Sequence, residues 1–591
     1  MGNMLVPWWD EIHQALWQVS GDPELIRVAE TARRVAREVV GPLVAGGGRS
    51  SCEWTPAKAA ALKALDEAGL NSLVTRTPGP IATRMALAAW ELAWVDAGAA
   101  ACSLSGSLAH TIIRDYGTRE QRDRYLERPE WRHGALCLTE LLPGAGAEAL
   151  LLAGTIKVAE RRPGGSRMLA VEKRGRFTSH MDFADFVLAA VAPGDRSVHN
   201  SCLVLLEPSD PGLFDRGAPT RKLGHQLSST TNPAFSLRVS PDRVLGGCTI
   251  EEGILIPRLT HGEALSSALR RARTVVGLMS ASKLLSAVEA IIAYHRGRKG
   301  APADWSHRLV DIWAAGEASA SLGFASTRLS DELDAAGDQC AALEKRAGVI
   351  CSCAKLFATS HAAPLLQGAL SLIGAPALAE DSPGFLGFKC VDAMVESLYL
   401  GPESLQRRQI SASIDDDFLS GFAAWTDETN RMAATHPETG AGSLAAGMEL
   451  WRYVFNRLKA LEDGRGVPLY SDVNQGTAFA MADALCLLAA SRALLVGLVE
   501  VRHNLSAGTG RGVNGPIALM TALGAVQSAR AAGVVAQICT QLLFGCRPRN
   551  QVSREERRLS GYLRSKLEAS LCGVAGVRDR AAESIRALAS A

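Results

Sequence analysis

Apolar residues recur every three or four positions through most of residues 20–129, the spacing of one buried helix face. The first such segment opens at Asp22-Pro23 and another at Thr55-Pro56, and both pairs are typical of helix starts. Three glycines at 46–48 separate the two segments. The pattern predicts an all-helical N-terminal domain over residues 1–133.

The pattern changes from helical to strand-like at Gly134. Short runs of β-branched or alternating residues follow, and Pro, Gly, Asp and Asn stand between them. The runs cover residues 135–139, 155–160, 168–173, 186–191, 201–206 and 234–239. They predict an antiparallel β-domain over residues 134–250, with its last strand ending before Gly247.

Helical spacing returns after residue 250 and continues to the end of the chain. Long apolar-periodic segments cover residues 265–294, 305–333 and 339–372, and a further helix is expected with Pro402 at its first position. These segments predict a bundle domain over residues 251–428 that contains a four-helix bundle. A Pro- and Gly-containing linker at 435–442 then leads into a C-terminal helical extension, residues 429–591. The expected fold is mainly α with a central β-domain.

Composition narrows the class of protein. The chain has 591 residues, 47% hydrophobic and 21% charged, with a formal net charge of +2 and no dense basic run, so we expect no nucleic-acid partner. Its thirteen cysteines are scattered and none are spaced C-x-x-C, which indicates reduced thiols, no metal site and a cytoplasmic enzyme. The longest apolar run, residues 482–501, contains Asp483 and Arg492, so it is predicted to be a buried helix and not a transmembrane segment.

Several motifs occur in a characteristic order. Cys137-Leu138-Thr139-Glu140 comes first, then Leu223-Gly224 with Ser228-x-Thr230, then Tyr294-x-x-x-Arg298, and finally the stretch from Asp392 to Gln409. In this order and spacing, residues 20–420 resemble the acyl-CoA dehydrogenase superfamily. The segment around Asn474 resembles the helical extension of the very-long-chain members. The resemblance implies FAD as cofactor, an acyl thioester carried by coenzyme A or by an acyl-carrier protein as substrate, and a homodimer.

The catalytic base implied by the resemblance is missing. The family's glutamate corresponds to Leu400, and leucine cannot take a proton. Some members place the glutamate on an earlier helix, where the register gives Ser267. Two nearby carboxylates are candidate substitutes: Glu403, one helical turn past Leu400, and Glu263, one turn before Ser267. Each also has the position of an ordinary helix-start residue.

The flavin-ring contacts implied by the resemblance persist in part. Thr139 corresponds to the threonine that touches the ring, whereas Ala145 replaces a serine on the phosphate side. Phe177 and Ser179 correspond to an aromatic residue and a hydroxyl that flank the ring. A core phenylalanine beside a surface serine is the structural alternative.

The contacts implied for the cofactor of a neighbouring subunit are more altered. Arg298 and His307 correspond to its arginine and glutamine, Gly374 to one glycine of a pair, and Gly401 to the turn before the cofactor-contacting helix. In that helix start, Pro402 and Ser404 replace a threonine and a glutamine. Three functions stay open: an atypical flavin-dependent oxidoreductase acting on an acyl thioester, a flavin-dependent oxidase or monooxygenase acting on a small metabolite, and a flavin-free subunit or repurposed enzyme.

Overall fold

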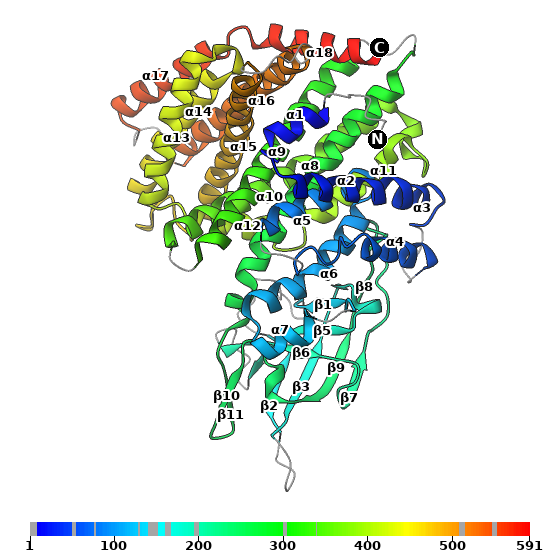
Figure 1. Ribbon diagram of the computed structural model, residues 1–591. Coiled ribbons are helices and arrows are strands. Elements are labelled where there is room, and N and C mark those ends of the chain that lie inside the picture. Colours follow the sequence, from blue (N-terminus) through cyan, green and yellow to red (C-terminus); the bar gives the residue numbers. More distant parts are fainter. Residues whose placement is uncertain are drawn as a thin grey trace. The chain divides into compact units, whose positions relative to one another are not determined.

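The computed structural model forms two compact units, one of residues 27–272 and one of residues 1–26 with 273–591. It describes residues 9–19, 21–49, 55–75, 79–127, 130–139, 152–159, 167–193, 200–298, 304–337, 340–506, 514–546 and 552–590. The four predicted segments therefore belong to two units, and Figure 1 labels their helices and strands.

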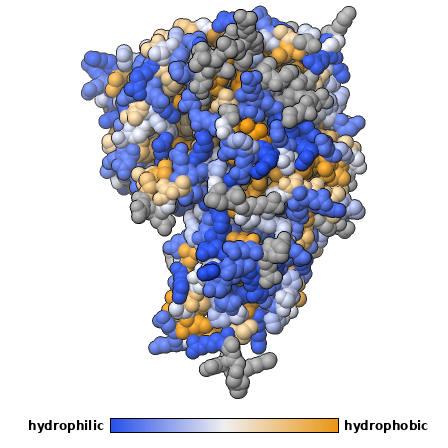
Figure 2. Space-filling view, viewed as in Figure 1, coloured by the Kyte–Doolittle hydropathy of each residue, from blue (hydrophilic) through white to orange (hydrophobic). Residues whose placement is uncertain are grey.

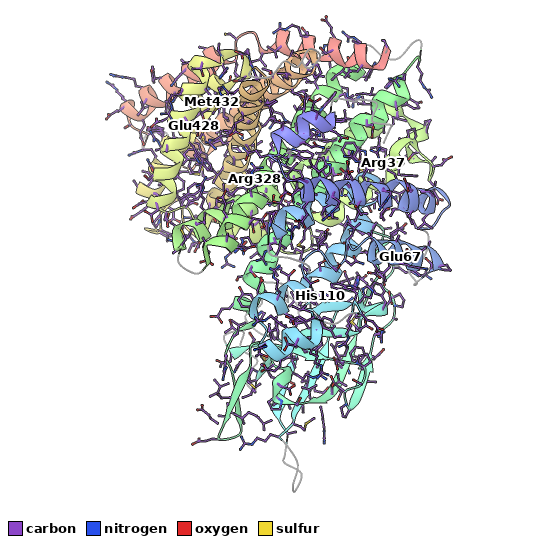
Figure 3. All side chains as sticks on the ribbon, viewed as in Figure 1. Arg37, Glu67, His110, Arg328, Glu428 and Met432 are labelled. Atoms are coloured by element: carbon purple, nitrogen blue, oxygen red, sulfur yellow. The ribbon has the colours of Figure 1, made fainter. Side chains whose placement is uncertain are left out.

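The N-terminal region is all-helical, as the spacing predicts. Its helices are α2 (Pro23–Val35), the π-helix η1 (Ala36–Val40), α3 (Gly41–Ala45), α4 (Pro56–Glu67), α5 (Ile81–Val95), α6 (Ala97–Tyr116) and α7 (Arg119–Tyr125). The expected start signals operate as caps: the Glu24 N–H donates to Asp22 Oδ1 at 2.9 Å, and the Lys58 N–H donates to Thr55 Oγ1 at 3.4 Å. In α6, buried His110, labelled in Figure 3, lies on the helix. Its ring stacks on that of Trp131.

The β-domain is built on one seven-stranded sheet. Its strands are β1 (Gly134–Cys137), β2 (Thr155–Val158), β3 (Leu169–Arg174), β5 (Phe186–Pro193), β6 (Cys202–Leu206), β7 (Gly212–Asp215) and β9 (Ala234–Val239). The order is β1-β5-β2-β3-β9-β7, with β6 also paired to β5. A hairpin of β10 (Cys248–Glu251) and β11 (Ile254–Pro257) extends the β-region past the predicted end near Gly247.

The prediction of antiparallel pairing needs a correction. Within the seven-stranded sheet, four ladders of the described residues are antiparallel, but β1 and β2 both run parallel to β5. Parallel neighbours require a long connection, and more than 40 residues separate β1 from β5. Strand β5 is buried on both faces: Val187 packs in one core, while Leu188 packs in the other with Ile112 of α6. Its unbroken apolar sequence follows from this double burial.

The named elements that the structure describes in the other unit are helices. Helix α8 (His261–His295) begins in the first unit and ends in this one; the rest are α1 (Trp9–Leu16), α9 (Trp305–Ala336), α10 (Ala341–Ile373), α11 (Leu386–Glu396), α12 (Glu403–Ala412), α13 (Asp416–Thr435), α14 (Ala441–Ala460), α15 (Gln475–Ser506), α16 (Asn514–Gly545), α17 (Arg554–Ser570) and α18 (Val574–Ser590). The bundle and the C-terminal extension are thus helical, as predicted. The run at 482–501 lies in α15 with most of its apolar residues buried.

Helix α1 precedes the first helix that the sequence predicts. It is held by the fully buried carboxylate of Glu317, which accepts hydrogen bonds from Trp9 Nε1 and Trp313 Nε1, both at 2.9 Å, and lies 2.9 Å from His13 Nε2. Arg328 of α9, labelled in Figure 3, lies on this helix. It donates to the Trp17 carbonyl at 2.7 Å. These bonds fix residues 9–17 against α9.

Four helices are long and apolar enough to cross a membrane when judged by length and composition. They are His261–His295, Ala341–Ile373, Gln475–His503 and Gly515–Gly545, and their apolar windows are 94%, 72%, 72% and 67% buried within the protein. The face seen in Figure 2 is mainly hydrophilic, with apolar side chains in scattered patches. We interpret the four as core helices, because their apolar residues are covered mainly by protein.

Candidate functional site

The turn after β3 brings Phe177 to the end of β1. The Arg176 N–H donates to the Thr139 carbonyl at 2.9 Å, which joins this turn to the residue that follows the strand. Gly175 lies so close to Cys137 that a Cβ would meet its Sγ at 2.5 Å, so a side chain does not fit there. Thr139 and Phe177, which the family resemblance implies as flavin contacts, therefore lie close to one another.

Phe177 has the geometry of a contact residue and not of a core residue. Its side chain is 54% exposed and its φ is +50°, in the left-handed region. The Phe177 N–H donates to Asn232 Oδ1 at 3.2 Å, and the Arg176 guanidinium carbon lies 5.2 Å from the centroid of the ring. The backbone is thus fixed while much of the ring stays open to a ligand.

Ser179 lies in a short strand next to two hydroxyls without partners. It belongs to β4 (Thr178–Ser179) and pairs with Thr230 in the antiparallel strand β8 (Thr230–Thr231). Among the described residues, the buried Ser229 and Thr230 hydroxyls have no hydrogen-bond partner. Unsatisfied buried hydroxyls are rare, and two adjacent ones indicate a place where a polar ligand completes the bonding.

One lysine holds the loop that leads to these hydroxyls. Lys222 Nζ donates to the carbonyls of His225 at 3.0 Å and Ser228 at 2.8 Å, and to Ser228 Oγ at 2.9 Å. The sequence signal for this cluster was the S-S-T-T run after Leu223-Gly224. Sequence reasoning quoted Thr230 without assigning it a role and left Lys222 and Ser229 out. Ala145, on the expected phosphate side, lies outside the described residues.

The residues expected at a neighbouring subunit's cofactor belong to the helical unit. Exposed Arg298 has its guanidinium carbon 3.8 Å from the centroid of the Tyr294 ring, and Gly374 ends α10 with a φ of +84°. His307, however, contacts the C-terminal helix: its Nε2 lies 3.0 Å from Asp579 Oδ1, and its carbonyl accepts from Arg578 at 3.1 Å. Its ring nitrogen is therefore engaged within its own chain.

A buried lysine forms hydrogen bonds to the backbone of the turn at Leu400. Leu400 and Gly401 have φ of +54° and +92°, and Lys355 Nζ donates to the carbonyl on either side, those of Tyr399 and Gly401, the latter at 2.6 Å. Pro402 is the N-cap of α12 and not its first helical residue, which corrects the sequence expectation. Burial, and then the charge of Arg273, lower the pKa of Lys355 to about 7.

The two candidate bases are both engaged by neighbours. Glu403 accepts from Arg407 at 3.0 Å, and Arg407 also donates to Asp483 at 2.8 Å. Glu263 is exposed and forms a capping box at the start of α8: it accepts from the Thr260 N–H at 2.8 Å and from its hydroxyl at 2.7 Å. These bonds lower the pKa of Glu263.

The alternative base position on α8 has a carboxylate beside it that sequence reasoning missed. Ser267 Oγ and Arg271 Nη1 both donate to Asp115 Oδ2 at 2.7 Å. Burial opposes ionisation of Asp115, but the charges of Arg271 and Arg114 outweigh it and lower its pKa. Asp115 is thus a stable carboxylate, held by cations and not poised to take a proton.

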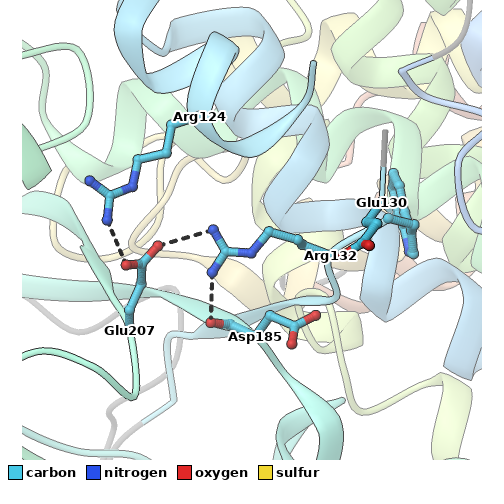
Figure 4. Close-up of a pocket in the computed structure, with 6 residues that line it drawn as sticks. Arg124, Glu130, Arg132, Asp185 and Glu207 are labelled. Carbon is cyan, nitrogen blue, oxygen red and sulfur yellow. Dashed lines mark hydrogen bonds and ion pairs between the residues drawn. The ribbon is translucent and has the colours of Figure 1, made fainter. Parts of the chain in front are cut away.

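A cavity of about 420 Å³ in the first unit is lined by charged residues that bind one another (Figure 4). Glu207 accepts from Arg124 at 2.6 Å, Arg132 at 3.1 Å and Arg243 at 2.9 Å. Burial opposes its ionised form, but these arginines prevail and bring the pKa of Glu207 to about 2. Because the cations already have partners, we interpret this cluster as structural.

Comparison with known proteins agrees with this architecture. Residues 22–129 match the N-terminal domain of acyl-CoA dehydrogenases, and residues 262–414 match their C-terminal domain. An acyl-CoA dehydrogenase of Bacillus anthracis, solved in complex with FAD, is 16% identical with a TM-score of 0.74, and the match covers 96% of this chain and 95% of that one.

Two shorter proteins match without the extension. Butyryl-CoA dehydrogenase of Megasphaera elsdenii is 20% identical with a TM-score of 0.54, over 66% of this chain and 97% of that one. Nitroalkane oxidase of Podospora anserina is 16% identical with a TM-score of 0.55, over 67% and 96%. At such identities the structures show that the chain has the acyl-CoA dehydrogenase fold, and the two family models identify residues 22–129 and 262–414 as acyl-CoA dehydrogenase N-terminal and C-terminal domains.

Proposed function

We propose that the protein is an FAD-dependent oxidoreductase that acts on an acyl thioester. The observation that carries the proposal is the cluster of exposed Phe177, Thr139, Ser179 and the two unpartnered hydroxyls of Ser229 and Thr230. An open aromatic face beside unsatisfied hydroxyls fits the flavin ring, which needs both a planar contact and hydrogen bonds. The FAD complex of the similar Bacillus protein supports the same cofactor.

Each residue of the cluster has a task in this proposal. Phe177 covers the ring, and Ser179 donates a hydrogen bond beside it. The hydroxyls of Ser229 and Thr230, which have no partner among the described residues, bond to the cofactor. The flavin, when bound, would accept a hydride from the substrate. Favourable bonds to its reduced form would make that acceptance easier.

Removal of the substrate's α-proton is the atypical step of the proposed reaction. Position 400 carries no base, and Glu263 is a helix cap, which leaves Glu403 as the candidate carboxylate on the turn. With Glu403 as base, Glu403→Gln should lower turnover with an acyl-CoA and an artificial electron acceptor by ~10²–10⁴-fold. Glu263→Gln is the matched control and should alter stability alone. Equal turnover in both variants would end the role proposed for Glu403.

A flavin-dependent oxidation of a small metabolite is the second candidate. The leucine at 400 favours it, because a substrate that needs no base at this position tolerates the exchange. The similar fold of nitroalkane oxidase supports it. Oxygen consumption without any acyl thioester, by protein that has bound FAD, would favour this candidate over the first.

We also propose a homodimer in the cytoplasm. Leu378 in the 3₁₀ helix η6 (Ala375–Leu378) is 73% exposed, and Met394 and Leu398 at α11 are 52% and 70% exposed. An exposed apolar surface of this kind is suited to cover by a second copy. Light scattering should give twice the mass of the chain, and Leu398→Glu should lower it to one mass.

A further inference from the structure

Two buried cations, Arg273 and Lys355, lie on facing helices, and Lys355 binds the Leu400 turn. Arg273 is on α8, one turn before Gly277, so both occupy the same helix face. At Gly277 the two helices touch, because a Cβ there would lie 3.0 Å from the Ala354 carbonyl oxygen and 3.3 Å from Lys355 Cα of α10. Arg273 and Lys355 therefore flank one helix contact.

Neither cation has a carboxylate partner among the described residues. Arg273 is 9% exposed, and its buried Nε has no hydrogen-bond partner. Lys355 is 1% exposed and donates to the carbonyls of Tyr399 and Gly401, which carry no full charge. A helix contact with two uncompensated cations is electrostatically unfavourable.

The two carboxylates that act on Lys355 are both ion-paired with other cations. Glu396 raises the pKa of Lys355, but it is ion-paired with Lys283 and accepts from Ser280. Glu403 acts in the same direction and is ion-paired with Arg407. Leu400 stands between the two carbonyls that Lys355 holds, where a carboxylate side chain would supply the missing charge.

We propose that Arg273 and Lys355 form a binding site for a carboxylate group that the ligand brings with it. The planar guanidinium pairs with both oxygens of a carboxylate, and the ammonium supplies a second positive charge. In the proposed function, the substrate would then be an acid whose free carboxylate sits at the Leu400 turn. The identity of the ligand as substrate rests on that function, whereas binding of the carboxylate requires neither flavin nor turnover.

Acetate is the probe for this site, and acetamide is its uncharged control of the same size. Thermal unfolding of the full chain should show a saturable rise in midpoint with sodium acetate at constant ionic strength, and none with acetamide. Arg273→Gln should weaken the acetate response at least ~10-fold, since a charged hydrogen bond is lost. Equal responses to acetate and acetamide, or an unchanged response in Arg273→Gln, would overturn the proposal.

A second measurement does not depend on removing a buried cation. Leu400→Glu supplies an internal carboxylate, and Leu400→Gln is its neutral match in size and backbone strain. The Glu variant should unfold at a higher temperature than the Gln variant and should lose the response to acetate. A Glu variant that is less stable than the Gln variant and still responds to acetate would refute the site. FAD binding plays no part in either assay, so failure of the proposed function leaves this result interpretable.

Discussion

Lys355→Met should change how the stability of the helical unit depends on pH. The pKa of Lys355 is about 7 in the fold, chiefly through burial, against its ordinary value of 10.5. Between these values the unfolded chain binds more protons than the folded one, so stability rises with pH through this window. Below pH 7 both states carry the proton and the full unfavourable contribution is present. The difference between the two pKa values corresponds to ~4–5 kcal/mol over the whole window.

The variant removes this titration together with two hydrogen bonds. The carbonyls of Tyr399 and Gly401 lose their donor, and an unsatisfied buried carbonyl costs ~1–3 kcal/mol. Wild type should therefore exceed Lys355→Met in stability most clearly near pH 10. The difference in unfolding free energy between wild type and Lys355→Met should become smaller towards pH 6, because only wild type then buries an ammonium group.

Urea unfolding midpoints of wild type and variant, measured from pH 6 to pH 10, give this stability difference directly. Lys566→Met is the matched control, since Lys566 is exposed and pairs with Glu449 at 2.7 Å. Its margin to wild type should stay nearly constant through the same window. If the Lys355→Met margin is flat, or falls as pH rises, the buried-cation reasoning is wrong.

Two further predictions concern buried carboxylates. Glu207→Gln should lower stability by ~1–3 kcal/mol at pH 7, where the carboxylate is held by Arg132 and Arg243. Because the pKa of Glu207 is depressed to about 2, wild type keeps this stabilising contribution above pH 4.5 and loses it as the pH falls towards 2. The stabilities of the variant and of wild type should therefore converge at acid pH in unfolding curves. Glu317→Gln should lower stability by ~2–4 kcal/mol, because three buried donors share that carboxylate. Limited proteolysis should then cleave the segment that holds Trp9. Unchanged protection of that segment would contradict the role of Glu317 in holding α1.

The fold was predictable where local patterns decide it. Helical spacing and caps such as Thr55 located most helices, and alternating runs located the longer strands. Helix α1 was missed although Trp9, Ile12 and Leu16 have helical spacing, because the segment is short. The parallel pairing of β5 was beyond reach, since register depends on contacts between distant segments.

The site was predictable only in part, for a related reason. Thr139 and Phe177 follow strands β1 and β3, Ser179 lies in β4, and the motif order pointed to all three. The engagement of His307 by Asp579 depends on a helix 272 residues further on. Arg273 and Lys355 look in sequence like ordinary helix charges, and only burial separates them from the many exposed ones.

FAD titration of Thr230→Val and wild-type protein tests the flavin site most directly. Valine keeps the shape of threonine but removes a buried hydroxyl that has no partner among the described residues, so the variant without cofactor should be as stable as wild type or more stable. If that hydroxyl serves FAD, quenching of flavin fluorescence should show binding to wild type and ~5–10-fold weaker binding to the variant. Leu213→Ala, a substitution at an exposed apolar position of the same unit, should bind FAD as wild type does. Folded wild-type protein that leaves flavin fluorescence unchanged at saturating FAD, or a Thr230→Val variant that binds it with unaltered affinity, would contradict the assignment.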